Sequence, residues 1–229
     1  MAQSATMRAN GGVRFNRFLA LVYLVMSLGL GITAYVSFQV TNNEELMQRI
    51  IFQPWLVWIL FFIQLAVVIA LSAAVMRLST IVALLLFLFY AALTGVTISS
   101  ILFFYSQTTV AYAFVVTSGM FLFSSLVGLL IRRDLSGAGQ FLLMALLGWA
   151  FAYFMGIFFP FEGLYNQSIV ILGILLFAGL TVWDTQQLKK LSSELEGQKG
   201  TGGIVVIGAL KLYLDFINLF LLLLRRAGR

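Results

Sequence analysis

The sequence contains no cysteine and no histidine among its 229 residues. The absence of cysteine excludes disulfide bonds, thiol nucleophiles and thiolate metal sites. The absence of histidine excludes the HExxH zinc proteases, the Ser-His dyad of a membrane serine protease and pH sensing by imidazole. If this protein responds to pH or moves protons, its carboxylates must do so.

Charged residues are also scarce, at 10% of the chain, and proline occurs only twice, as Pro54 and Pro160. Both prolines stand at the boundary of an apolar run, where proline is tolerated. A soluble domain is about one quarter charged and less than half apolar, whereas this chain is 62% hydrophobic. One aqueous core cannot bury that excess, so the composition predicts an all-α polytopic membrane protein without a separate soluble domain.

Seven apolar runs follow one another along the chain, at about 18–40, 54–76, 80–104, 110–131, 140–160, 167–188 and 204–224. Each is close to the roughly 20 residues that a helix needs to cross a bilayer. We therefore expect one seven-helix transmembrane domain over residues 18–229, after a cytoplasmic tail at residues 1–17. The first run lacks a small-x-small cleavage site and is expected to stay in the membrane. The separator near 189–203 is the most polar and is expected to be mobile.

Basic residues indicate the orientation, since cytoplasmic loops carry more lysine and arginine than outer loops. With the N-terminus inside, the inner side holds nine of them: Arg8, Arg14, Arg17, Arg77, Arg132, Arg133, Lys189, Lys190 and Lys199. The outer side then holds four: Arg49, Arg225, Arg226 and Arg229. A last segment that dips in and returns would bring the three C-terminal arginines inside, but 204–224 is long enough to cross. The scattered charges are topology signals and predict no nucleic-acid partner.

Small residues recur at helical spacing in two runs, as Ala91, Gly95 and Ser99 and as Ser124 and Gly128. Such spacing lets helix backbones approach closely. Packing within one bundle is the preferred interpretation, and a dimerisation face is the alternative. The glycine-rich stretch 197–203 lacks the spacing of a phosphate-binding loop and is expected to be a flexible connection.

Three ionisable residues lie within or at the end of the last two apolar runs: Asp184, Lys211 and Asp215. A charge at the centre of a bilayer costs roughly 3 kcal/mol on insertion scales, so these residues need pairing, water or protonation. Lys211 and Asp215 are four residues apart and share a helix face. Asn218 adds a hydrogen-bonding group to that face, and Thr181 lies one turn before Asp184.

The predicted orientation places Asp184 near the cytoplasmic surface, at the same membrane level as Arg77 at the end of the second run. Asp215 can reach this level if the last helix begins early. An aspartate near a helix end can be purely structural. An aspartate deep in a span, with a lysine one turn away, is by default a functional-site hypothesis.

Two segments resemble the signature sequences of the Bax inhibitor-1 family, also called the transmembrane BAX inhibitor motif family. They are GLTVWDTQQLKKL at 179–191 and GALKLYLDFINLFLLLLR at 208–225. ALTGVTISSI at 92–101 and RRDLSGAGQ at 132–140 are similar to further segments of its bacterial members. The resemblance implies a bundle with the seventh helix at its centre and localisation in the bacterial inner membrane.

The resemblance also implies roles for particular residues. In that family the aspartates that match Asp184 and Asp215 share a proton and respond to pH, and the arginine that matches Arg77 latches onto them and closes the pore. The family is associated with a pH-dependent calcium leak, and some bacterial members bind a membrane protease. Two residues depart from the pattern: Gln64 stands where some members have a glutamate, and Lys211 stands where small or hydroxyl residues are usual.

These observations predict a pH-sensitive cation leak channel, with calcium as the expected ion. Two carboxylates in a low-dielectric site cannot both ionise at low cost and would titrate as a coupled pair. Calcium prefers oxygen ligands, so Asp184 and Asp215 would hold it together with waters. No other cofactor is expected.

Two other functions compete with the channel. An intramembrane aspartyl protease also places one aspartate on each of two helices, but its GxGD motif is replaced here by LYLD, and its proline-containing motif is absent. We therefore expect no enzymatic activity. A membrane interaction protein, which modulates a protease or a stress factor without transport of its own, remains the alternative.

Overall fold

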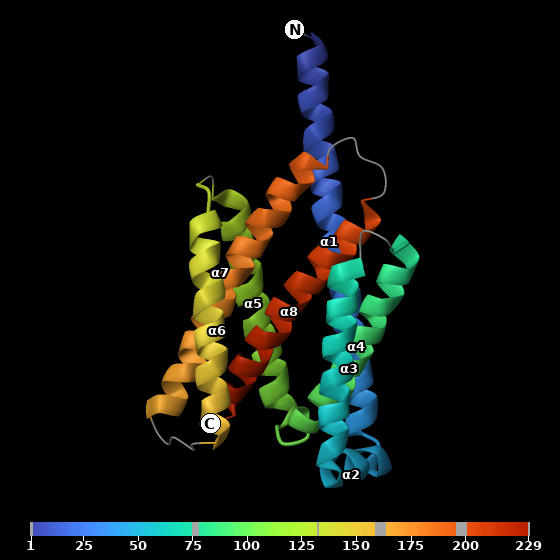
Figure 1. Ribbon diagram of the computed structural model, residues 1–229, viewed down its shortest axis with the longest axis vertical. Helices are drawn as coiled ribbons and strands as arrows, with labels where there is room; N and C mark the ends of the chain where they lie inside the picture. The colour runs from blue at the N-terminus through green and yellow to red at the C-terminus, as the bar shows by residue number, and fades with distance from the viewer. Residues whose placement is uncertain (1, 75–77, 132, 159–163, 196–200, 229) are drawn as a thin grey trace. The chain divides into compact units, whose positions relative to one another are not determined.

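The computed structural model describes residues 2–74, 78–131, 133–158, 164–195 and 201–228, which form helices and short connections without any strand (Figure 1). The helices are α1 (Ala2–Thr41), α2 (Glu44–Phe52), α3 (Pro54–Ala74), α4 (Thr80–Leu102), α5 (Gln107–Leu130), α6 (Ser136–Phe158), α7 (Leu164–Glu194) and α8 (Gly202–Ala227). The prediction of an all-α polytopic membrane protein is confirmed. Each of the seven apolar runs lies, for most of its described residues, in a helix of its own.

Among the described residues, six helices are long and apolar enough to cross a membrane. They lie in α1, from Arg17 to Thr41, and in α4, α5, α6, α7 and α8. The remaining predicted span, the second along the chain, lies in α3, which has 21 residues and is therefore about 32 Å long at 1.5 Å per residue. The described part of α3 contributes a shorter apolar stretch, Trp58–Ala73.

Helix α2 lies in a separator where no helix was predicted. Asn43 caps its first turn by accepting a hydrogen bond from the backbone N–H of Leu46, at 3.0 Å. Its buried residues are Met47 and Ile50, three positions apart on one face. This cap residue and this spacing are the local sequence signals for α2.

The predicted mobile separator at 189–203 is shorter than expected, because α7 continues to Glu194 and α8 begins at Gly202. Gly202 is required there, since a Cβ would overlap the side chain of Thr80 in α4. Gly202 therefore serves the close packing of α8 against α4. Residues 196–200 lie outside the described part of the chain.

Contacts divide the chain into two compact units. Unit 1 comprises Met1–Ser106 and Leu191–Tyr213, and unit 2 comprises Gln107–Lys190 and Leu214–Arg229. Helix α8 therefore contributes its first half to unit 1 and its second half to unit 2. The apolar window of α8 is 67% buried, the largest share of the six spans found among the described residues; a central position of the C-terminal helix stays a prediction.

In unit 1, helices α1 and α4 approach closely through small residues. A Cβ on Gly95 would lie 2.8 Å from the carbonyl oxygen of Thr33 and 2.9 Å from the Cβ of Val36, and Ala91 is fully buried. Gly29 likewise leaves room for the ring of Phe87. The small residues of the third apolar run thus serve packing within the bundle, as the preferred interpretation predicted.

In unit 2, glycines of three helices receive large neighbours. Gly128 of α5 lies against the backbone of Val182 and the side chain of Thr185 in α7, and Gly139 of α6 lies against the indole of Trp183. Gly173 of α7 accommodates the ring of Trp149 from α6 and the side chain of Leu222 from α8. Since lipid supplies no hydrophobic force between helices, this close van der Waals packing is what holds such helices together.

Candidate functional site

Both candidate carboxylates are buried in unit 2. Asp184 lies on α7 with 8% of its surface exposed, and Asp215 lies on α8 with 6% exposed. Buried aspartates are rare in any protein unless they are paired. In an apolar span they mark a functional site by default.

The helix register places the two aspartates at neighbouring levels. Helix α7 and the second half of α8 run in opposite directions (Figure 1), and they touch where Gly173 meets Leu222. Asp184 lies eleven residues after Gly173, and Asp215 lies seven residues before Leu222. The two levels therefore differ by about four residues, or about 6 Å along the helix axes.

Two threonines next to Asp184 are fully buried but differ in their hydrogen bonds. The hydroxyl of Thr181 donates to the backbone carbonyl of Phe177 at 2.9 Å, the usual arrangement for threonine within a helix. In the part of the chain that the structure describes, the hydroxyls of Thr185 and of the buried Ser125 on α5 have no hydrogen-bond partner. Such groups commonly bind an ordered water, so both hydroxyls can hold one, and Thr185 directly follows Asp184 in the sequence.

The structure says less about the other predicted site residues, Lys211, Asn218 and Arg77. Lys211 is exposed and belongs to unit 1, so its pairing with Asp215 stays a prediction. Asn218 is half-buried on α8 in unit 2. Arg77 lies outside the described residues, and its role as a latch stays a prediction as well.

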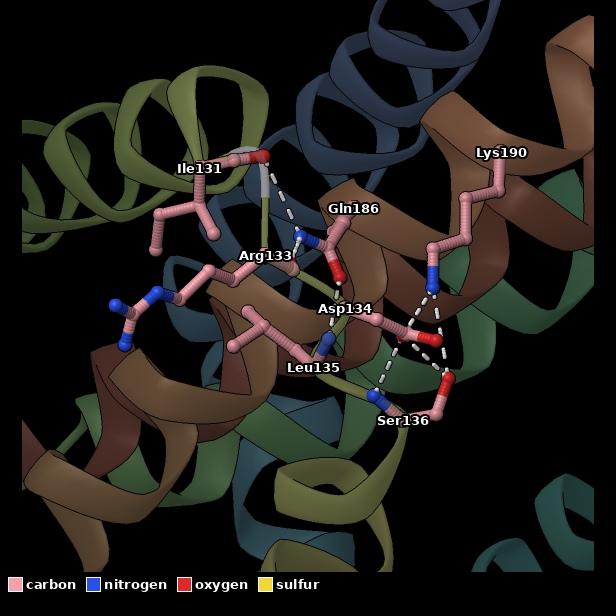
Figure 2. Close-up of polar contacts among 7 residues, drawn as sticks. All are labelled: Ile131, Arg133, Asp134, Leu135, Ser136, Gln186 and Lys190. Atoms are coloured by element: carbon pink, nitrogen blue, oxygen red, sulfur yellow. Dashed lines mark hydrogen bonds and ion pairs between the residues drawn. The ribbon is translucent and has the colours of Figure 1, made fainter.

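Two residues after Asp184, the buried side chain of Gln186 binds the connection between α5 and α6 (Figure 2). Its amide nitrogen donates to the carbonyl of Arg133 at 2.7 Å and to that of Ile131 at 3.4 Å. Its amide oxygen accepts a hydrogen bond from the backbone N–H of Leu135 at 3.0 Å. One side chain thus satisfies three backbone groups that have no helical partner.

Two lysines extend this attachment. Lys189 donates to the carbonyl of Leu129 at 2.6 Å, which satisfies one of the last backbone oxygens of α5. Lys190 forms an ion pair with Asp134, whose carboxylate also accepts from the backbone N–H and the hydroxyl of Ser136 (Figure 2). The hydrogen bond from Lys190, followed by those from Ser136, holds the pKa of Asp134 well below its usual range.

We call Gln186, Lys189 and Lys190, together with the segment 129–136 that they bind, the α7 clamp. From the sequence, the two lysines were interpreted only as topology signals, and Gln186 was given no role. The available signal was three polar residues at i, i+3 and i+4 after an apolar segment, which lie on one helix face. Their partners could not be read from the sequence, because the contacts join positions 51 to 60 residues apart.

At the other end of unit 2, Arg225 of α8 donates to the amide oxygen of Asn166 at 2.6 Å and to the hydroxyl of Tyr153 at 3.0 Å. The basic residues of the α7 clamp and Arg225 therefore lie at opposite ends of this helix group. Helix α8 is uninterrupted over 26 residues, about 39 Å. A full crossing fits this length, and a segment that dips in and returns does not.

A second buried polar group lies in unit 1. The hydroxyl of Thr33 lies 2.6 Å from the hydroxyl of Tyr213 and donates to the carbonyl of Ala91 at 2.9 Å. Gln64 of α3 donates to the hydroxyl of Thr97 at 3.1 Å and to that of Thr94 at 3.4 Å. In this chain an uncharged amide therefore bridges α3 and α4 at the position where the sequence lacks the expected glutamate.

Within the described residues, no three side chains of the types His, Cys, Asp and Glu gather at one place. Calcium takes six to eight oxygen ligands. A cation at Asp184 and Asp215 would therefore complete its coordination with water, hydroxyl and backbone oxygens.

Comparison with known proteins agrees with the resemblance noted in the sequence. A family model described as "Inhibitor of apoptosis-promoting Bax1" matches residues 15–228 of this chain. The inner membrane protein YbhL of Escherichia coli strain K12 is 41% identical over 214 residues, which cover 92% of this chain and 91% of that protein.

Two further relatives match this chain over a similar length. An uncharacterized protein of Deinococcus radiodurans is 43% identical over 208 residues, which cover 90% of this chain and 88% of the relative. An uncharacterized membrane protein of Streptococcus pyogenes serotype M3 is 37% identical over 219 residues, which cover 95% and 94% of the two chains. The similarity therefore extends over nearly the whole length of each protein.

Proposed function

This chain belongs to the Bax inhibitor-1 family of membrane proteins, and we propose that it is a pH-sensitive cation leak channel gated by Asp184 and Asp215. The observation that carries the proposal is the burial of two carboxylates, one on each of two consecutive helices, at neighbouring levels of unit 2. Each would cost several kcal/mol as an isolated charge in an apolar span. A carboxylate in an apolar span is therefore expected to have a function.

The proposed gate depends on one proton. When the two carboxyl groups share a proton, they form a strong hydrogen bond that joins α7 to α8. At higher pH the pair becomes dianionic, and the repulsion must be relieved by separation, by a cation or by a basic side chain. Lys211 and Arg77 are the proposed basic partners. The element is bistable, and the proton concentration sets its populations.

The proposed ion is calcium, which prefers oxygen ligands. Asp184 and Asp215 would supply charged oxygens, and the buried hydroxyls of Thr185 and Ser125 indicate where water can complete the coordination. The channel would need no cofactor and would carry out no chemical reaction. Its partners would be the lipid bilayer, protons and the permeant cation.

The proposed location is the bacterial inner membrane with the N-terminus in the cytoplasm. The distribution of lysine and arginine supports this orientation, and the relative YbhL is described as an inner membrane protein. The proposed orientation places the α7 clamp on the cytoplasmic side and Arg225 on the outer side.

The proposal is tested by calcium flux into proteoliposomes across a range of pH. We expect flux by the purified protein, and we expect Asp184→Asn and Asp215→Asn to abolish its pH dependence while the protein stays folded. An unchanged pH dependence in both variants would reject the gate. No flux at any pH would favour the alternative, a membrane interaction protein that modulates a protease or a stress factor.

A further inference from the structure

The segment of α7 that carries Asp184 is attached to its neighbours on both sides of that residue. Before and after Asp184, Val182 and Thr185 lie against Gly128 of α5. Beyond it, Gln186 and Lys189 bind the backbone of the segment 129–136. These hydrogen bonds are directional and lengthen with any rotation or sliding of α7.

The second half of α8 packs within unit 2 through ring contacts near Asp215 and through hydrogen bonds at its C-terminal end. The ring of Phe216 packs edge-on against Phe114 and Phe121 of α5, with centroid distances of 5.7 and 5.5 Å. Arg225 donates hydrogen bonds to Asn166 of α7 and to Tyr153 of α6, so directional contacts hold the C-terminal end of α8 as well.

We propose that Gln186 is a positioning residue for the carboxylate pair: by holding α7 to the α5–α6 connection it fixes the position of Asp184. The inference rests on the proposed function. It assigns the static side of the gate to α5 and α7. Gln186 acts through the helix and is not itself a ligand of the proton or the cation.

The titratable groups around this segment are few. Helices α5 and α6, which pack against α7, contain one titratable side chain each, Tyr112 and Tyr153. The remaining titratable or charged side chains of unit 2 are Arg132, Arg133, Asp134, Glu162, Tyr165, Asp184, Lys189, Lys190, Asp215, Arg225, Arg226 and Arg229. Of the four carboxylates, Asp134 is exposed and paired with Lys190, and Glu162 lies outside the described residues. Asp184 and Asp215 are the carboxylates that lie within the apolar spans.

The first test measures flux in proteoliposomes against pH. Gln186→Leu removes the three hydrogen bonds with little change in volume, so Asp184 is held less firmly and shares the proton less well. We expect half-maximal flux to shift to lower pH by about half a unit or more. Gln186→Glu keeps the acceptor for Leu135 but loses both donor bonds and adds a carboxylate, so it should not restore the parental midpoint. Gln187→Leu, at the half-buried neighbour, is the matched control and should leave the midpoint unchanged.

The second test does not depend on flux. Because the chain has no cysteine, spin labels can be attached at Leu126→Cys on α5 and Leu175→Cys on α7, both of which are exposed. We expect one narrow distance between the labels at about pH 5 and about pH 8. We expect a broader distribution when Gln186→Leu is added, and no change with Gln187→Leu.

Two results would overturn the inference. One is a pH-dependent distance between the labels on α5 and α7 in the otherwise unaltered protein. The other is a Gln186→Leu protein with the flux midpoint and the label distances of the parent. Retained pH dependence in Asp184→Asn and Asp215→Asn would instead reject the gate, and the label distances would still decide whether Gln186 holds α7 in place.

Discussion

The hydroxyl groups of Thr33 and Tyr213 lie 2.6 Å apart, although 180 residues separate them in the sequence. Tyr213 is fully buried, and its ring packs edge-on against Phe87 and Tyr90, with centroid distances of 5.5 and 6.0 Å. The phenol therefore joins the first half of α8 to α1 and α4 by one hydrogen bond and two ring contacts. In an apolar span, such a bond is the most specific link available between helices.

This link predicts a measurable loss of stability. Tyr213→Phe keeps the ring contacts and removes the hydrogen bond to Thr33, so the free energy of unfolding in micelles should fall by about 1 kcal/mol. The control is Tyr112→Phe, at a hydroxyl-bearing ring that is 65% exposed, which should unfold like the parent. Equal stability of the two variants would contradict the prediction.

The glycines of α5 provide a matched pair for testing helix packing. A Cβ on Gly128 would overlap the carbonyl oxygen of Val182 and lie 3.0 Å from the Cβ of Thr185, whereas a Cβ on Gly119 would meet no atom within 4 Å. Gly128→Ala should therefore lower the free energy of unfolding by roughly 1–3 kcal/mol through overpacking. Gly119→Ala should be neutral or stabilising by up to about 1 kcal/mol, since alanine favours the helix.

The measurement is thermal or denaturant unfolding of both variants in the same detergent. A folded Gly128→Ala protein of parental stability would show that α5 and α7 do not approach as closely as the structure has them. Gly119→Ala also reports whether the exposed face of α5 is occupied, because an added methyl group there would then be destabilising.

The ion pair between Lys190 and Asp134 predicts a pH range over which its contribution to stability does not change. The pKa of Asp134 is lowered in the folded protein by the hydrogen bond from Lys190. A lowered pKa gives stability that is complete above the unfolded value of about 3.9 and that is lost as the pH falls below it. The contribution of the pair should therefore be constant between about pH 5 and pH 8.

Asp134→Asn accordingly should leave the pH dependence of calcium flux unchanged over that range. The stability difference between Asp134→Asn and the parent should also be constant there and should shrink only in stronger acid. Unfolding curves and flux, both recorded against pH, check these two expectations. A shift of the flux midpoint in Asp134→Asn would mean that this exposed pair contributes to pH sensing.

The sequence by itself determined the helical class, the seven apolar runs and the two carboxylates. The reason is that a backbone in lipid must satisfy its own hydrogen bonds, so a long apolar run has to be a helix. A carboxylate in such a run is costly enough to be conspicuous at positions 184 and 215. The sequence predicted that Gly95 and Gly128 allow helices to pack closely, but it could not predict which residues they contact.

Only the tertiary structure decided which helix faces meet. Most of these helices are apolar on every side, so no periodic pattern marks the face that packs against a neighbour. The contacts of Gln186 with Arg133, and of Thr33 with Tyr213, join residues 53 and 180 positions apart. They depend on the rotation and level of each helix, which are set by the fit of side chains across the interface and not by local sequence.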